Sequence, residues 1–441
     1  MNNKYNTKEN AKIALSIANI LVYEIIFLAI VMFCYKDYFF YYSNGYDIFF
    51  VVYLALYLLF GRLFSAFELG ETTTTDLFLS HSLAVLFSNF LIFLVLSLLA
   101  LKLIPLWPII LMQLLEMTFG AGLLLLENRY IRRVYPPIKA IAIYGEEHYN
   151  LIGRLNNVKD LSISIVKTID MKDVDYKHFD DLLEGIDAVI TLDVHHNNKK
   201  KIFKSCYERK IMVYDVPSIT DMLLASSSIL HIVDTPILKI NKFGPSHIEA
   251  IFKRLIDIVG SLILLIIASP IMIITALAIK IEDGGDVFYG HTRLTKDKKE
   301  FKIVKFRSMV MNAEKMTGVV LAKQNDNRIT KVGSFIRKTR IDELPQLINI
   351  LTGDMSFVGP RPERPEIYKE ITKKMPEFEY RLVVKAGLTG YAQIYGKYNT
   401  SLRDKLLLDL YYIENYSLID DIRLILLTMK IVFKPESTEG V

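Results

Sequence analysis

The sequence that decides the fold of the first third of the chain is LFLSHSLAVLFSNFLIFLVLSLLALKLIPLWPIILMQLLEMTFGAGLLLL, residues 77–126. This stretch contains only two charged residues, Lys102 and Glu116. A helix of about 20 apolar residues crosses the hydrocarbon core of a bilayer, so the stretch is long enough for two crossings. Lys102, Pro105 and Pro108 interrupt it and predict a turn, because proline cannot continue a helix without strain. We therefore predict two membrane-spanning helices, over 77–101 and 106–126.

Two more apolar stretches lie closer to the N-terminus, over 13–34 and 48–67, which makes four predicted spans. Basic residues flank this set at both ends: Lys4, Lys8 and Lys12 precede the first span, and Arg129, Arg132, Arg133 and Lys139 follow the fourth. Because basic residues next to spans stay on the cytoplasmic side, we expect both ends of the bundle in the cytoplasm. Glu24 and Glu116 fall near the middle of a span. Each is either a functional group or a protonated or hydrogen-bonded group between helices.

The composition of the whole chain indicates a membrane part joined to a part that resembles soluble proteins. The 441 residues are 52% hydrophobic and 23% charged, which excludes a disordered or fibrous protein. The formal net charge of +5 is too small to indicate nucleic-acid binding, but it suits a surface that faces anionic lipid or phosphates. Cys34 and Cys206 lie far apart and predict neither a disulfide framework nor a cysteine metal site.

The middle of the chain has the pattern of an α/β domain. Short apolar or β-branched runs over 140–144, 162–168, 188–192 and 211–214 alternate with charged stretches, which is typical of parallel βαβ units. The first run is followed by Gly145, Glu146, Glu147 and His148, and one glycine with two acids is a poor cradle for a phosphate. We therefore predict a Rossmann-like cytosolic domain without a tightly bound dinucleotide. The predicted domains are 1–135, 136–245 and 246–441.

A fifth apolar stretch covers about 255–280, between Lys253-Arg254 and Lys280. It is long enough to span a membrane, but basic residues flank both ends and give neither orientation an advantage. Ser269 and Pro270 lie at its centre, where proline kinks a helix and the serine hydroxyl could satisfy a freed carbonyl. We predict a re-entrant helix that bends here and keeps both flanks in the cytoplasm. A kinked fifth span is the alternative.

Charged clusters after this stretch carry the candidate chemistry. Lys305 and Arg307 are two apart in a predicted strand and would share a face, which favours phosphate binding over a solvated surface. Asp342 and Glu343 precede Pro345, which fits the first turn of a helix. With basic residues before it, such a carboxylate stays ionised and can act as a nucleophile or metal ligand. A simple charge pair at a helix N-terminus is the alternative.

Two further clusters follow towards the C-terminus. Arg361 lies between two prolines, and this stiff turn suits a guanidinium aimed at a phosphate. A plain surface turn is the alternative. Tyr391 and Gln393 lie in a glycine-rich segment, where the backbone can approach a ligand closely. These two side chains could read a base or a sugar, but an ordinary turn explains the segment equally well.

The order of the motifs resembles that of a known family. From about residue 248 onward they are Asp257, Ser269-Pro270, Lys305-Phe306-Arg307-Ser308-Met309, Asp342-Glu343-Leu344-Pro345-Gln346, Pro360-Arg361-Pro362 and Gly387-Leu388-Thr389-Gly390. This part of the chain resembles the bacterial sugar transferases, which are membrane phosphoglycosyl transferases also called polyprenyl-phosphate hexose-1-phosphate transferases. With four spans and a Rossmann-like domain ahead of it, the chain is similar to the larger members that start exopolysaccharide or capsule synthesis.

The resemblance implies a reaction and a set of roles. It implies transfer of a hexose-1-phosphate from a UDP-sugar to undecaprenyl phosphate with release of UMP, through a covalent phosphosugar intermediate on Asp342. It also implies Mg²⁺ at Asp342 and Glu343, where Glu343 places the metal or takes a proton. Arg361 and Arg337 match anion-binding positions of the family. The implied location is the bacterial cell membrane, with several spans and a cytoplasmic catalytic domain in contact with membrane lipid.

The resemblance leaves alternatives for one loop, for the sugar and for the middle domain. Arg254 with Asp257 fits an anchoring ion pair of the family. Residues 291–295, His-Thr-Arg-Leu-Thr, stand where many members have a Gln and a following Gly around the arginine, so sugar or nucleotide contacts of this loop are undetermined. Glucose, galactose or an N-acetylated sugar all fit, and the middle domain could serve dimerisation, regulation or no catalytic role. The competing functions are a glycosyl transferase that releases UDP and a membrane scaffold or nucleotide-sensing regulator.

Overall fold

The computed structural model describes residues 2–38, 45–145, 163–175, 178–240, 244–311, 326–396 and 400–432. Its contacts divide the chain into two compact units, Met1–Val216 and Pro217–Val441. Three residues of the turn that was expected after the first strand, Glu146, Glu147 and His148, lie outside the described residues.

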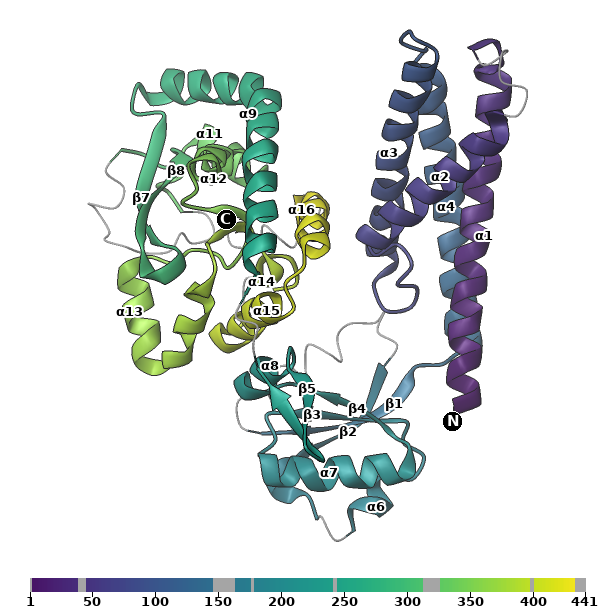
Figure 1. The fold of residues 1–441 in the computed structure, drawn as a ribbon, viewed down its shortest axis with the longest axis vertical. Helices are drawn as coiled ribbons and strands as arrows, with labels where there is room; N and C mark the ends of the chain where they lie inside the picture. Colours follow the sequence, from purple (N-terminus) through teal and green to yellow (C-terminus); the bar gives the residue numbers. More distant parts are fainter. Residues whose placement is uncertain are drawn as a thin grey trace. The chain divides into compact units, whose positions relative to one another are not determined.

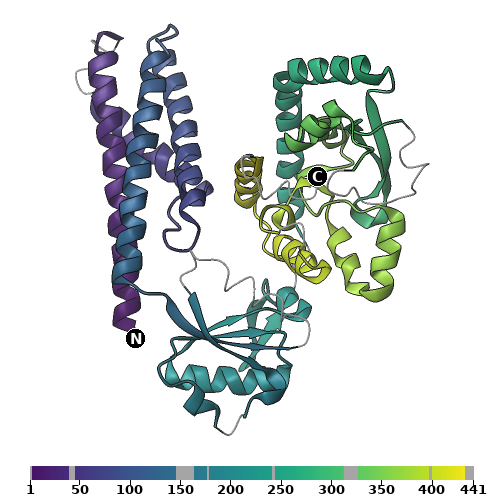
Figure 2. The same ribbon diagram turned by 180° about the vertical axis from the view of Figure 1, so that it is seen from behind.

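The first unit begins with a bundle of four helices (Figures 1 and 2). They are α1 (Asn2–Cys34), α2 (Gly45–Leu63), α3 (Thr74–Leu99) and α4 (Trp107–Val134). The predicted turn between the third and fourth spans is confirmed, since α3 ends before Lys102 and α4 starts with Trp107-Pro108. Proline fits this position because the first turn of a helix needs no N–H from it.

Four helices in the described part of the chain are long and apolar enough to cross a membrane. Three belong to the bundle, α1, α3 and α4, and the fourth is α9 (His247–Asp283) of the second unit. The apolar part of α2 that the structure describes, Ile48–Leu63, is shorter than a full span. The expected second span over 48–67 is therefore shorter than predicted, because the helix ends at Leu63.

The two acids expected inside the spans have different surroundings. The Glu116 carboxylate is buried and accepts hydrogen bonds from the Tyr53 hydroxyl at 2.6 Å and from Asn89 Nδ2 at 2.7 Å. These partners come from α2 and α3, so Glu116 of α4 joins three helices, as the hydrogen-bonded alternative predicted. Glu24 of α1 is buried as well, but its carboxylate has no hydrogen-bond partner within the described residues.

The rest of the first unit is a parallel sheet of four strands in the order β2-β1-β3-β4. The strands are β1 (Ile138–Tyr144), β2 (Ile163–Asp170), β3 (Ala188–Leu192) and β4 (Met212–Asp215). Figure 1 shows the helices α6 (Phe179–Leu182) and α7 (His196–Arg209) on one face. The expected parallel strands are confirmed, and the Rossmann-like assignment stays a prediction. A Cβ at Gly145 would lie 2.4 Å from the carbonyl oxygen of Asp193, so close packing of two chain segments explains this glycine.

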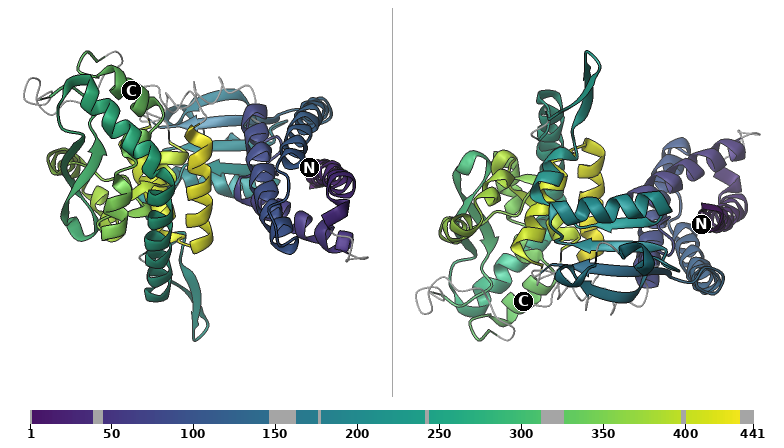
Figure 3. Two further views of the ribbon diagram at one scale, coloured as in Figure 1. Left: turned by 90° about the horizontal axis from the view of Figure 1, so that it is seen from above. Right: turned by 90° about the horizontal axis from the view of Figure 1, so that it is seen from below.

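The second unit combines short strands with many helices. In chain order, with η for a 3-10 turn, it contains α8 (Ile219–Leu224), β5 (Ser228–Ile232), β6 (Thr235–Lys239), α9, β7 (Phe288–Leu294), β8 (Glu300–Phe306), α11 (Lys331–Lys338), η4 (Ile341–Glu343), α12 (Gln346–Thr352), β9 (Ser356–Val358), α13 (Pro365–Lys374), η5 (Pro376–Val383), β10 (Gly387–Thr389), α14 (Tyr391–Ile394), α15 (Leu402–Glu414) and α16 (Leu418–Val432). Figure 3 shows the β5–β6 hairpin extending away from the rest of this unit. Helix α8 lies within 217–245, which was expected in the middle domain, but it contributes the buried Met222 to the core of the second unit.

Helix α9 is long and bent (Figures 1 and 2). Most of its apolar side chains are exposed. Pro270 lies inside it and cannot donate a hydrogen bond to the carbonyl of Ile266 four residues earlier. The Ser269 hydroxyl donates to that carbonyl at 2.8 Å instead. The predicted role of Ser269 is therefore confirmed. The position of this helix in the membrane stays a prediction.

The first turns of α9 are fixed in the core of the second unit. Arg254 donates to the carbonyl oxygens of Ile350 and Leu351 at 2.7 and 2.8 Å. Asp257 accepts hydrogen bonds from the Ser356 hydroxyl and the Phe357 amide, each at 3.0 Å. Arg254 and Asp257 do not form the expected ion pair with each other, because Arg254 binds the end of α12 and Asp257 binds β9.

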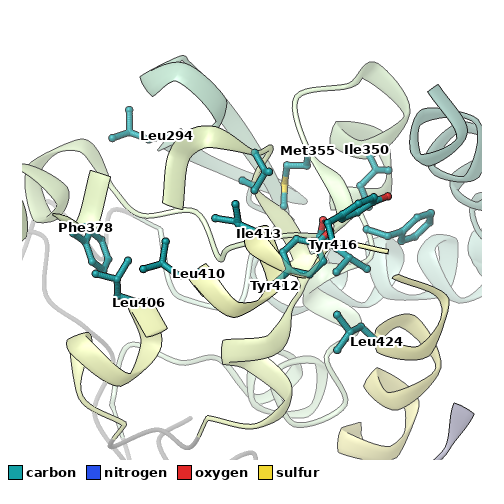
Figure 4. Packing of buried hydrophobic residues seen from close by; sticks show 14 of the residues in the cluster. Leu294, Ile350, Met355, Phe378, Leu406, Leu410, Tyr412, Ile413, Tyr416 and Leu424 are labelled. Carbon is teal, nitrogen blue, oxygen red and sulfur yellow. The ribbon is translucent and has the colours of Figure 1, made fainter. Parts of the chain in front are cut away.

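A buried charge cluster joins α9 to the C-terminal helices. Lys253 lies 2.7 Å from the Asp421 carboxylate, and the two side chains are only 12% and 3% exposed. Asp421 also accepts a hydrogen bond from Tyr412 at 2.7 Å. Around this cluster lies the largely apolar core shown in Figure 4, to which α12, β9, α15 and α16 contribute. The core supports the loops that carry the candidate site.

Candidate active site

The acid pair lies in a tight turn between two helices. Asp342 and Glu343 belong to η4, and the following helix α12 starts only at Gln346. The acids lie in the first turn of a helix, as expected, but this helix is the short 3-10 turn η4, and Pro345 caps the following α12. Arg340 precedes the turn with a φ of 59°, a left-handed conformation that is uncommon outside glycine. This sharp reversal presents both carboxylates next to the preceding basic helix α11.

Cations surround Glu343. Its Oε1 atom accepts hydrogen bonds from Lys305 Nζ at 2.7 Å and from Arg361 Nη2 at 3.2 Å, and Arg340 Nη1 lies 3.8 Å from Oε2. Burial alone would raise the pKa of Glu343, but Lys305, Arg361 and Arg340 outweigh it and hold that pKa well below its usual range. Glu343 therefore stays ionised and is a fixed anion at the centre of the site.

Asp342 behaves in the opposite way. Burial, followed by the negative charge of Glu343, raises the pKa of Asp342 to about 6, although Lys305, Arg337 and Arg340 act against this rise. Within the described residues, no hydrogen bond or ion pair engages its carboxylate. At neutral pH Asp342 is thus mostly ionised and available to attack an electrophile or bind a cation.

The strand pair β7–β8 brings the first cation to the acid pair. Lys305 lies opposite Tyr289 in this antiparallel pair and reaches Glu343 from the end of β8. Arg307 lies one residue past β8 and is not brought to the acid pair. Its buried guanidinium binds the carboxylate of Asp283, with Nη1 at 2.6 Å from Oδ2, and so ties β8 to the end of α9. The two cations do not share one site.

A second loop supplies Arg361. The segment before it is tightly packed, because a Cβ at Gly359 would lie 2.3 Å from the carbonyl oxygen of Lys385. The Arg361 guanidinium donates to Glu343 and also to Gln393 Oε1 at 3.2 Å. Its side chain remains 47% exposed, so it can still meet a ligand. The structure therefore groups Asp342, Glu343, Lys305, Arg361 and Gln393.

The other predicted residues lie at the edge of this group. Arg337 is half-buried in α11 and acts on Asp342 through its charge rather than through a direct contact. Tyr391 packs against Tyr395 and Tyr411, with ring centroids 5.3 and 5.1 Å away, which indicates a structural role for its ring. Arg340 was missed as a site residue, although it lies in the basic run before the acids.

Comparison with known proteins covers the part of the chain that carries this site. A model of the family described as "Bacterial sugar transferase" matches residues 248–435. The exopolysaccharide production protein PSS of Rhizobium leguminosarum bv. phaseoli is 37% identical over 188 residues, which are 40% of this chain and 92% of that protein.

Two longer relatives carry more specific names. The UDP-N-acetylgalactosamine-undecaprenyl-phosphate N-acetylgalactosaminephosphotransferase of Aeromonas hydrophila is 36% identical over 236 residues, 53% of this chain and 55% of that protein. The undecaprenyl-phosphate galactose phosphotransferase of Salmonella typhimurium is 37% identical over 235 residues, 50% of this chain and 48% of that protein. The chain thus spans about half the length of these relatives. Because the Rhizobium protein is matched over nearly its whole length, and the matched region contains the acid pair and Arg361, the chain belongs to the bacterial sugar transferase family.

Proposed function

We propose that this protein transfers a hexose-1-phosphate from a UDP-sugar to undecaprenyl phosphate and releases UMP. The observation that carries the proposal is the contrast within the acid pair. Within the described residues no hydrogen bond or ion pair engages the Asp342 carboxylate, whereas Lys305 and Arg361 engage Glu343. One carboxylate next to several cations fits phosphoryl transfer, in which charge stabilisation and positioning do most of the work.

In the first step, a carboxylate oxygen of Asp342 attacks the phosphorus that bears the sugar. The new O–P bond forms as the bond to the bridging oxygen of the diphosphate breaks, and UMP leaves with that electron pair. Lys305 and Arg361 stabilise the charge that accumulates on the phosphoryl oxygens. Glu343 keeps these two cations in place, and they hold its pKa well below its usual range.

In the second step, a phosphate oxygen of undecaprenyl phosphate attacks the phosphorus of the aspartyl intermediate. The acyl phosphate bond breaks and returns the electron pair to the Asp342 carboxylate. The two steps balance in atoms and charge without a proton transfer. A covalent intermediate lets one site serve a water-soluble donor and a lipid acceptor in turn.

Mg²⁺ is the cofactor proposed for this site. Within the described residues no group of three or more His, Cys, Asp or Glu side chains could hold a metal by itself. Mg²⁺ typically binds through one or two carboxylates together with substrate phosphates, so the sparse acid pair fits it. Asp342 is the better ligand, because cations already engage Glu343. The ion would neutralise charge on the diphosphate.

The proposed position of the site is at the cytoplasmic face of a bacterial cell membrane. Its support is the bent α9, whose exposed apolar side chains lie between Lys253 and Lys280. A helix that enters the bilayer and returns would keep the acid pair on the side where UDP-sugars are made. Labelling of introduced cysteines over 282–300 tests this: labelling from the outside alone would contradict re-entry and favour a fifth span.

The proposed activity is tested with purified protein, undecaprenyl phosphate and a panel of labelled UDP-sugars. The names of relatives mention N-acetylgalactosamine, galactose and glucose, so the UDP forms of these three sugars are tested first. We expect label in the lipid fraction together with UMP. Release of UDP would instead indicate a glycosyl transferase, and no turnover with any donor would favour a scaffold or regulator. Omission of the acceptor should leave the sugar phosphate bound covalently to the protein.

A further inference from the structure

Arg293 of β7 contacts the turn that presents Arg361. Its Nη1 atom donates to the carbonyl oxygen of Pro362 at 2.9 Å and lies 3.7 Å from the carboxylate of Glu363. Its Nε atom donates to Nε2 of His291, two residues earlier in the same strand, at 2.7 Å. The side chain is only 21% exposed. Arg293 is therefore fixed on both sides, and one of its contacts is with the residue directly after Arg361.

The sequence Pro360-Arg361-Pro362 makes this contact more important than an ordinary side-chain hydrogen bond. Proline has no N–H, so both prolines can form backbone hydrogen bonds only through their carbonyl oxygens. The Pro360 carbonyl accepts from the backbone amide of Gly387 at 3.0 Å. The Pro362 carbonyl accepts from Arg293. One side of the turn is thus held by backbone and the other by a side chain that mutation can remove.

Neighbouring contacts define what remains when Arg293 is lost. The Leu294 amide donates to the Glu363 carbonyl at 3.0 Å, which keeps β7 near the turn. Glu363 also lies 3.8 Å from Arg381, whose guanidinium is paired with the buried Asp409. Loss of Arg293 therefore frees the Pro362 carbonyl without separating β7 from the turn. We expect a local loosening at Arg361 and no general unfolding.

We infer that Arg293 is a positioning residue, which holds the Pro360-Arg361-Pro362 turn so that Arg361 stays against Glu343. The inference rests on the proposed function and adds a residue to it. Arg361 bonds Glu343 and Gln393 at 3.2 Å each, at the long end of the usual range, so a small shift of its backbone breaks both contacts. Arg293 does not touch the acid pair in this arrangement and acts through Arg361.

The geometry also explains why arginine is needed at position 293. Its guanidinium donates from Nε to His291 and from Nη1 to Pro362 at once, which the planar fork of arginine allows. A lysine carries one ammonium group and cannot reproduce both directions. Arg293→Lys keeps the charge but loses the fork. We expect the activity of Arg293→Lys to lie between the activity of the wild type and that of Arg293→Met.

The test is a double-mutant cycle on the full-length protein in detergent or nanodiscs, with UMP release as the readout. We expect Arg293→Met to lower kcat/KM at least tenfold in the wild-type background. In the Arg361→Ala background, assayed with more enzyme, the same change should cost less than threefold, because the residue to be positioned is gone. If turnover of Arg361→Ala is below detection, Arg361→Lys provides the second background.

A matched control separates positioning from general damage. Lys298→Met removes a surface cation that pairs with Glu379 and is 55% exposed, and it should change kcat/KM less than twofold in both backgrounds. A merely structural role of Arg293 would lower the active fraction by the same factor in both backgrounds. Equal losses therefore overturn the inference. Absence of UMP release by the wild type with every donor would overturn the proposed function instead.

Discussion

Replacement of Glu343 by Gln should move the pH dependence of the reaction to lower pH. The charge of Glu343 is the second cause, after burial, that raises the pKa of Asp342 to about 6 from its ordinary value of 3.8. The substitution removes this repulsion and leaves Lys305 and Arg340 free to stabilise an ionised Asp342, while burial stays in place. The lost repulsion and the freed cations both lower the pKa of Asp342. Since burial is the larger cause, we expect a decrease by about one pH unit, equivalent to about 1.4 kcal/mol.

The direction of the effect on rate follows from the form that reacts. Asp342 attacks as a carboxylate, so kcat/KM for the UDP-sugar decreases as the pH falls through about 6 in the wild type. In Glu343→Gln the decrease should start about one pH unit lower, even though the maximum rate also falls because Lys305 and Arg361 lose their anchor. In a mechanism with a covalent intermediate, this parameter reports the first half-reaction alone. Titration of the lipid phosphate therefore does not distort it.

The assay is UMP release between about pH 4.5 and 8 at limiting UDP-sugar, with membrane-fraction abundance as a check on folding. Glu379→Gln is the matched control, because this carboxylate is 43% exposed and pairs with Lys298 away from the acid pair. The control should keep the acid limb of the wild type. An acid limb of Glu343→Gln that stays in place or moves to higher pH would refute the reasoning.

Three further changes test the site and its support. Asp342→Asn should abolish UMP release without loss of membrane insertion, and normal turnover would eliminate the covalent mechanism. Arg361→Ala should lower kcat/KM at least tenfold, about 1.4 kcal/mol of transition-state stabilisation, and an unchanged rate would reduce Arg361 to a surface turn. Lys253→Met leaves Asp421 buried without its cation and should destabilise the second unit by about 3 to 5 kcal/mol. A thermal midpoint in detergent equal to that of the wild type would contradict this last expectation.

The sequence predicted the main elements because their signals are local. Apolar length identified the helices of the bundle, and alternation of apolar runs located β1, β2, β3 and β4 to within a few residues. The break at Ser269-Pro270 was also readable, since proline removes a specific backbone hydrogen bond whose replacement lies three residues away. Helix α2 was predicted too long because apolar side chains continue past Leu63, where the helix has already ended.

The candidate site was predicted in its parts but not in its pairings. The spacing predicted that Lys305 and Arg307 share one site. Arg307 instead binds Asp283, which lies 24 residues earlier, and strand periodicity cannot show such a contact. Similarly, nothing local indicates that Lys305 pairs with Glu343 rather than with a ligand. Arg293 stands at the arginine of the family pattern, and only the residues around it depart from that pattern, so the sequence assigned it no role. Its role depends on a carbonyl 69 residues later in the chain.

Helix α9 has a consequence for the lipid substrate. Arg254 and Asp257 lock its first turns to α12 and β9, the elements that follow the acid pair in the chain. In the proposed membrane position, helix α9 then fixes the distance between Asp342 and the lipid headgroups. The enzyme would accept the phosphate only at that depth. The site would not select for the length of the hydrocarbon tail below that depth, so acceptors with shorter polyprenyl chains should serve nearly as well as undecaprenyl phosphate.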